Sequence, residues 1–236
     1  MRTNWFYSAI LSLLSNWNVF GQPVDAIPVL EPELLPTLIE VKKRNAELDS
    51  IYALIDEGTI KDSEISEQTQ REIDEWMSGG WADSNYPDSI FASSSLPSQG
   101  NYTYYPKNAH DFKESTAWIE ANAGYGEGEF LAFRFPKFRA DEPLTTITIY
   151  NGYQRSEGSW QQNSRVKILR VYDGDKPIAD LLLADTKKGQ RFKLKINPKG
   201  DNLILIKLEI REVYPGLKWK DTGITEIQFD GLWQGI

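Results

Sequence analysis

The chain has 236 residues, one histidine, no cysteine and a formal net charge of −8. The lack of cysteine excludes disulfides, thiolate nucleophiles and cysteine-ligated metals, and a chain of this length holds one ordinary domain and at most a small second one. The aromatic content of 12% and the 17 glycines favour an all-β domain with many tight turns.

The first expected element is an export signal. A single cation, Arg2, precedes an apolar run over residues 5–14, which is too short to span a bilayer because a span needs roughly 20 apolar residues. Short side chains near residues 21 and 26 suit a signal peptidase, so we predict a signal peptide over residues 1–21, with cleavage as late as residue 26 as a second choice. An uncleaved amphipathic helix is the alternative. Export predicts a secreted or periplasmic protein with no stable membrane insertion.

Residues 27–78 are expected to be an acidic helical region. Between Glu31 and Glu75 there are 13 acidic and 5 basic residues, a balance of −8 that equals the formal charge of the whole chain. Apolar residues recur with a period of 3.5 from Leu34 to Ile55, which predicts a helix, and Gly58 follows as its C-cap.

A second helix over about residues 63–77 would complete a helical hairpin, with a coiled coil as the alternative. Residues 79–89 are rich in glycine, serine, aspartate and proline, which predicts a linker.

Residues 90–231 change to an alternating pattern. Phe192, Leu194 and Ile196 alternate with lysines, which is typical of a strand with one wet face. Asp173-Gly174 between two apolar runs predicts a hairpin. About eight such strands without room for crossover helices predict a mainly β fold, an antiparallel jelly-roll β-sandwich preceded by the short α-helical region. Neither half of the chain is basic enough to neutralise a row of phosphates, so nucleic acid is not an expected partner.

Three loops of the sandwich should meet at one end, because successive antiparallel strands alternate in direction. These are the loops before Glu129, after Tyr150 and after Val213. Aromatic rings beside amide and guanidinium donors suit a sugar, which stacks one face on a ring and bonds its hydroxyls in plane. The predicted ligand-binding residues are Tyr125, Tyr153, Arg155, Trp160, Asn163 and Trp219. For any one of these residues, the alternative is that it packs the end of the sandwich and does not contact a ligand.

A family resemblance covers about residues 90–231. The stretches "STAWIEANAGYGEGEFLAFRF", "ITIYNGYQRS", "NSRVKILRV" and "REVYPGLKWKDTGITEIQFDG" together resemble the discoidin-like domain of the NAD glycohydrolase translocation family. This domain belongs to the superfamily of discoidin and coagulation-factor type C domains, which are galactose-binding-domain-like jelly rolls. The resemblance implies that Trp118 sits on a short buried strand and anchors the core, and that the glycine run opens onto the ligand-binding end.

The resemblance also implies a structural calcium site. Many relatives hold calcium in an Asp-Gly-Asp turn ahead of the Thr-Ala-Trp element, with a glutamate from the last strand. Asp111, Thr116 and Glu226 match these positions, whereas Lys113 replaces the second aspartate. Calcium takes about six to eight oxygen ligands, so the lysine puts the site in doubt. The alternative is that Asp111 caps a turn and Glu226 is solvated. No other cofactor is expected.

Catalytic residues are not predicted. His110 has no nucleophile partner by motif, and no metalloprotease, serine-hydrolase or P-loop pattern occurs. Acid pairs such as Glu127 and Glu129 give only a weak glycosidase alternative. We therefore expect a non-enzymatic exported protein that binds a glycan or another cell-surface ligand. The alternative is a structural or partner-binding protein whose sandwich and acidic helices dock another protein.

Overall fold

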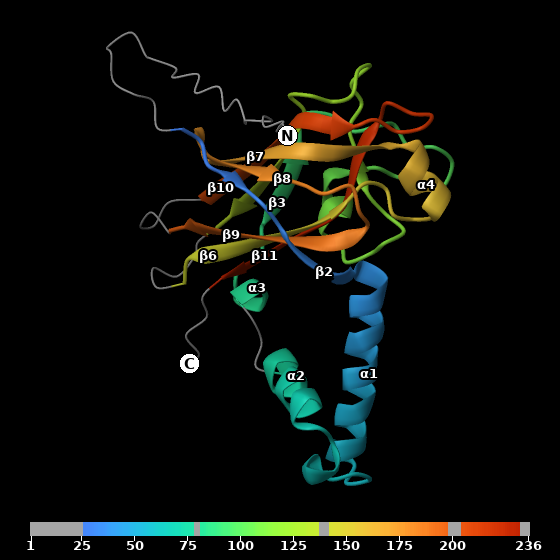
Figure 1. The fold of residues 1–236 in the computed structure, drawn as a ribbon, viewed down its shortest axis with the longest axis vertical. Coiled ribbons are helices and arrows are strands. Elements are labelled where there is room, and N and C mark those ends of the chain that lie inside the picture. The colour runs from blue at the N-terminus through green and yellow to red at the C-terminus, as the bar shows by residue number, and fades with distance from the viewer. Residues whose placement is uncertain (1–25, 78–80, 137–141, 198–203, 232–236) are drawn as a thin grey trace, which may run out of the picture.

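The computed structural model describes residues 26–77, 81–136, 142–197 and 204–231 (Figure 1). The predicted signal peptide lies outside these residues. The helices are α1 (Leu38–Asp56), α2 (Glu67–Met77), α3 (Trp81–Ser84) and α4 (Glu157–Gln162), with 3-10 turns at Asp62–Glu64 and Pro106–His110. The strands are β1 (Val29–Leu30), β2 (Glu33–Thr37), β3 (Ser89–Ala92), β4 (Trp118–Ile119), β5 (Phe130–Phe135), β6 (Leu144–Asn151), β7 (Ser164–Asp173), β8 (Lys176–Leu182), β9 (Lys188–Ile196), β10 (Ile204–Tyr214) and β11 (Thr222–Gly231).

The strands form two packed layers. Their hydrogen-bonded order is β2-β9-β6-β11-β7-β10-β5-β3, with β8 beside β7, β1 beside β8 and β4 beside β11. The β11–β7 contact is parallel and joins Thr222 to Ser164 and Gly223 to Arg165. Around this short link the strands separate into one layer with β6, β9 and β11 and another with β7, β8 and β10 (Figure 1). The predicted mainly β sandwich is confirmed, although β1 also pairs with β8 in parallel.

The core lies between the two layers, where the apolar side chains of the alternating strands meet. Phe133 and Phe229 pack edge to face with ring centroids 4.8 Å apart, and both are buried. Trp118 on β4 is fully buried, and its indole N–H donates to the Ser94 carbonyl at 2.9 Å. The expectation that this tryptophan anchors the core is therefore confirmed, and each large side chain so buried contributes roughly 1.5–3 kcal/mol.

Helix α1 begins at Leu38, four residues later than the first residue of the apolar period. The Thr37 hydroxyl accepts the Glu40 N–H at 3.4 Å, and the Glu40 carboxylate accepts the Thr37 N–H at 2.8 Å, which is a capping box. The prediction that Leu34 belongs to the helix is wrong, because residues 33–37 instead extend the sheet as β2 beside β9. Gly58 has φ +70° and its N–H bonds to Ile55, as expected of a C-cap.

Helices α1 and α2 form the predicted hairpin. Leu48 of α1 and Ile73 of α2 are buried, and Arg44 pairs with Glu72 at 2.7 Å across the two helices. The hairpin projects away from the sandwich (Figure 1). None of the helices in the described ranges is long and apolar enough to cross a membrane.

The segment expected to be a linker includes part of the core. Trp81 begins α3 and is fully buried, its indole N–H donates to the Glu142 carbonyl at 2.8 Å, and its ring lies 6.1 Å from that of Phe135. Asn85 is also buried and its amide donates to the Trp81 carbonyl at 2.9 Å. Composition could not indicate this, because a tryptophan among glycine and aspartate finds its partners only in distant strands.

Candidate functional site

Four loops meet at one end of the sandwich, over residues 94–105, 120–128, 152–163 and 215–222, which we call the loop end. Backbone bonds tie the last two together, as the Leu217 N–H donates to Gln161 at 3.0 Å. The Thr222 hydroxyl donates to the Tyr125 carbonyl at 2.8 Å, and the Leu96 N–H donates to Ile119 at 2.8 Å. The three loops chosen from strand direction thus lie together, with residues 94–105 as a fourth.

A buried glutamate fixes two of these loops. Glu120 is fully buried, and its carboxylate accepts the N–H groups of Thr222, at 2.9 Å, and of Asn122. Burial raises the pKa of this carboxyl. Gly126 has φ +78°, and a Cβ there would lie 2.7 Å from the Glu120 side chain, so the turn requires glycine.

The loop end encloses a cavity of about 250 Å³. Its lining residues are Leu96, Gln99, Tyr104, Ile119, Tyr153, Ser159, Gln162, Asn163, Trp219 and Asp221. Three predicted residues, Tyr153, Asn163 and Trp219, are among them. Tyr153 packs edge to face on Tyr104 with centroids 6.1 Å apart, and Trp219 leaves 46% of its surface exposed at the rim. The Lys218 ammonium lies over one face of the Trp219 ring, 4.5 Å from its centroid, so the pocket combines a partly exposed indole with amide and carboxyl groups.

Arg155 lies beside this cavity and is exposed. Its guanidinium sits 3.6 Å from the centroid of the Tyr102 ring and donates to the Tyr102 hydroxyl. This hydrogen bond raises the pKa of Arg155. The stacked pair presents a cation and an aromatic edge at one position, which is a suitable arrangement for hydroxyl or carboxylate groups.

Two predicted residues have structural contacts instead. Trp160 is half-buried, its N–H donates to the Asn151 carbonyl at 3.1 Å, and Arg165 lies 4.8 Å above its ring. It packs so closely on Gly152, with φ +78°, that a Cβ there would lie 2.8 Å from the indole. Tyr125 is half-buried and packs against the core. Neither ring lines the cavity, because each fills a gap beneath its own loop.

The sequence reasoning missed the loop of residues 94–105. Tyr102 and Tyr104 come from it, as does Gln99 on the cavity wall. The signal available was the run "NYTYY" in a polar, glycine-containing loop, which places aromatics where no strand needs them. Asp221 was also missed, and burial raises the pKa of its carboxyl.

The residues implied for calcium lie close together but bond to protein groups. The Asp111 carboxylate accepts the Thr116 hydroxyl at 2.8 Å and the Lys113 N–H at 3.0 Å, so it caps its own turn. One oxygen of Glu226 accepts the N–H groups of Asp111 and Phe112 at 3.1 and 2.8 Å. The alternative that Glu226 is solvated is wrong, since it is fully buried.

These residues do not fit a calcium ion. Backbone N–H donors occupy the position in front of Glu226 that a cation would need, and a metal ion requires acceptors there. Within the described ranges no group of three or more histidine, aspartate or glutamate side chains is placed to hold a metal. Burial raises the pKa of Glu226 to about 8. The hydrogen bonds from the N–H groups of Phe112 and Asp111 lower it, but burial has the larger effect.

The fold and its loop end define the class of the domain. Two jelly-roll layers linked through β11 and β7, with loops gathered at one end, form a discoidin-like domain of the F5/8 type C class. Residues 81–230 match the family described as NAD glycohydrolase translocation F5/8 type C domain, and the chain belongs to this family. The match begins at Trp81, in the segment that the composition indicated as a linker.

Several solved structures are similar. The CBM32-1, CBM32-2 and M60 catalytic domains of Clostridium perfringens ZmpB share 14% identity over 65% of this chain and 15% of that chain, with a TM-score of 0.45. The CBM32-1 and CBM32-2 domains of the same protein in complex with GalNAc share 13% over 64% and 35%, with a TM-score of 0.44. The Streptococcus pyogenes NAD+-glycohydrolase translocation domain shares 24% over 49% and 97%, with a TM-score of 0.31. This chain thus spans only 15% and 35% of the two clostridial chains. No curated protein matches it.

Proposed function

We propose that this chain is an exported, non-catalytic binding protein that recognises a glycan through its loop end. The observation that carries the proposal is the cavity with Trp219 exposed at its rim and amide and carboxyl groups of Gln99, Asn163 and Asp221 along its walls. A sugar ring stacks its apolar face on an indole while its hydroxyls bond to such groups.

Two groups that could serve in catalysis are engaged in other contacts, which supports a binding role. His110, the single histidine, lies beside β11, where its Nδ1 bonds to the Ile227 carbonyl at 2.7 Å. Glu129, half of the acid pair considered above, bonds to the hydroxyls of Ser93 and Ser94. These groups are engaged by their own neighbours and do not face a shared substrate position.

A docking role for the acidic helices has less support. It required an uncovered apolar seam on α1, but Leu38 and Leu48 of that seam are buried and Val41, Tyr52 and Ile55 are half-buried. If no glycan binds in the test below, a protein partner becomes the better interpretation.

The test is a glycan array probed with the purified protein, followed by titration of the best ligand. Trp219→Ala should weaken binding by roughly ten-fold, because a stacking indole contributes on the order of 1 kcal/mol or more. Leu217→Ala is the matched control, since Leu217 is 81% exposed in the same loop but does not line the cavity. The proposal fails if no glycan binds, or if both variants bind like the wild type.

A further inference from the structure

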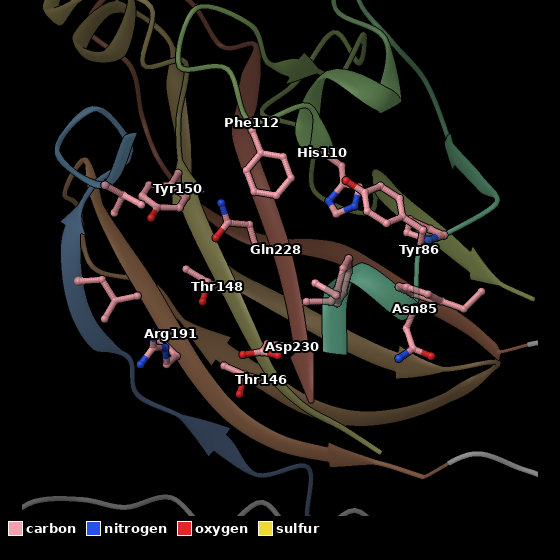
Figure 2. A pocket seen from close by; sticks show the side chains of 16 residues that line it. Asn85, Tyr86, His110, Phe112, Thr146, Thr148, Tyr150, Arg191, Gln228 and Asp230 are labelled. Atoms are coloured by element: carbon pink, nitrogen blue, oxygen red, sulfur yellow. The ribbon is translucent and has the colours of Figure 1, made fainter. Parts of the chain in front are cut away.

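A second cavity, of about 280 Å³, lies on the outer face of the layer that contains β6, β9 and β11 (Figure 2). We call it the face cleft. Its lining residues are Leu35, Val41, Ala82, Asn85, Tyr86, Pro87, His110, Phe112, Phe135, Thr146, Thr148, Tyr150, Arg191, Gln228, Phe229 and Asp230. Only Leu35 and Val41 come from outside the residues that match the family.

The floor of the face cleft is a polar row set by strand register. Thr148 of β6 pairs with Arg191 of β9 on one side and with Gln228 of β11 on the other. The neighbouring residues Ile147 and Ile149 turn into the core, so the row must point outward. Figure 2 shows Gln228, Thr148 and Arg191 along this floor.

These floor groups have unused hydrogen-bonding capacity. Among the described residues, neither the Thr148 hydroxyl nor the Gln228 amide has a hydrogen-bond partner, although only 7% of Thr148 is exposed. The guanidinium of Arg191 has one distant ion pair, to Glu33 at 3.9 Å. These polar atoms still reach solvent in the cleft, so a ligand that enters it can bond to them without first breaking a protein hydrogen bond.

One side of the face cleft is an aromatic wall. Tyr86, His110 and Phe112 follow one another with ring centroids 5.6 and 6.1 Å apart (Figure 2). Tyr86 and Phe112 are 56% and 46% exposed. The backbone of Phe112 has φ +57°, a left-handed conformation that a bulky residue rarely adopts, and the bonds from residues 111 and 112 to Glu226 hold it there. The fold thus keeps a strained turn that presents an apolar ring to solvent.

The charge of the face cleft excludes a strongly anionic ligand. Arg191 is its one cation among the described lining residues, and Asp230 offers an opposite charge on the same floor. A phosphate group is bound by several cations or by a set of backbone N–H groups, and neither is present among these residues. Rings on one side and neutral donors and acceptors on the floor suit a neutral, hydroxyl-rich molecule. The volume lies just below the range of roughly 300–1,000 Å³ for ligand pockets, which suits one small molecule.

We propose that the face cleft is a second saccharide site, separate from the loop end, that takes one neutral pyranose unit. The sugar stacks on the wall formed by Tyr86 and Phe112, and its hydroxyls bond to Thr148, Gln228 and Arg191. Leu35 of β2 and Val41 of α1 also line the cleft, so the segment before the family match takes part in binding. Two sites at different places on one domain let it hold a branched or repeating glycan at two points.

The experiment is an NMR titration of the full chain with methyl glucoside, methyl galactoside, methyl mannoside, GlcNAc and GalNAc at tens of millimolar. At least one sugar should shift the backbone amides of Thr148 and Gln228. Phe112→Gly should lower its affinity roughly ten-fold, and Thr148→Val several-fold. Thr148→Val should leave the melting temperature unchanged, since it replaces a hydroxyl without a protein partner. Phe112→Gly should lower it only slightly, because relief of the strained backbone offsets part of the packing lost on His110.

Two further variants separate this proposal from the loop end. Trp219→Ala should leave the shifts in the face cleft unchanged, and Phe91→Ala controls for loss of an exposed ring, since Phe91 is 43% exposed on β3 and does not line the face cleft. The proposal is overturned if no sugar shifts the cleft amides, or if Phe112→Gly and Thr148→Val bind as tightly as the wild type. Loss of cleft binding in Trp219→Ala alone would also overturn it.

Discussion

The loop end and the face cleft place similar side chains on very different supports. In the loop end, rings and amides come from four loops, and Glu120 fixes two of these loops with its two carboxylate oxygens. In the face cleft, the polar groups come from adjacent strands, and Glu226 holds only the turn that carries Phe112, with its second oxygen unpartnered. Loop positions are free to vary with the ligand, whereas strand register fixes which side chains share a row. The comparison suggests an adaptable site and a rigid one within a single domain.

The largest expected effect concerns the stability of the segment before β3, which forms part of the wall of the face cleft. Trp81→Ala should lower the free energy of unfolding by roughly 3–5 kcal/mol, because it empties a fully buried indole site next to Ala82 and Asn85 of the cleft wall. Tyr86→Ala, at an exposed position in the same segment, should change it by less than about 0.5 kcal/mol. Urea unfolding measures both. Equal stability of Trp81→Ala and the wild type would mean that α3 does not pack as described.

The second prediction uses the glutamate beneath the face cleft. The Glu226 carboxyl keeps its proton up to about pH 8 in the folded state, whereas its ordinary pKa is 4.5, so the unfolded chain releases a proton between these values and stability falls as pH rises. This loss should be on the order of 3 kcal/mol and should vanish in Glu226→Gln.

Urea titrations at several pH values between 4.5 and 8 check this slope. Glu127→Gln is the control, because Glu127 is exposed. A slope that persists in Glu226→Gln would assign the pH dependence to other groups and would remove this contrast with the loop end.

The third prediction separates support from contact within the loop end. Trp160→Ala should lower stability by about 1–2 kcal/mol, because it removes a half-buried ring and the bond to Asn151. Trp219→Ala should leave stability nearly unchanged while it weakens binding. Thermal unfolding and glycan titration of both variants give the comparison. If Trp160→Ala weakens binding without any loss of stability, Trp160 contacts the ligand directly.

The smallest expected effect concerns calcium. The turn of residues 111–116 supports the aromatic wall of the face cleft, and its acids already bond to protein N–H and hydroxyl groups. Adding calcium to millimolar concentration, or adding a chelator, should therefore leave the melting temperature unchanged. A rise with calcium that Asp111→Asn abolishes would show that an ion belongs there.

Local and periodic signals in the sequence determined much of the fold. The alternation in residues 192–196, the turn at Gly174 and the C-cap at Gly58 each depend on neighbouring residues, so a single segment is enough to predict them. The resemblance to the family added the prediction that Trp118 is buried. Strand direction was also sufficient to bring the three chosen loops to one end.

The tertiary structure alone decided which side chains are free. Trp160 and Trp219 lie in similar polar loops, yet the first packs between Gly152 and Arg165 at the two ends of its own loop, whereas the second keeps 46% of its surface exposed. The same holds for Trp81, whose partners are Phe135 and residues near 142 and 231. The face cleft joins residues from positions 35 to 230, and such a cavity follows from the packing of separate segments, which no local pattern contains.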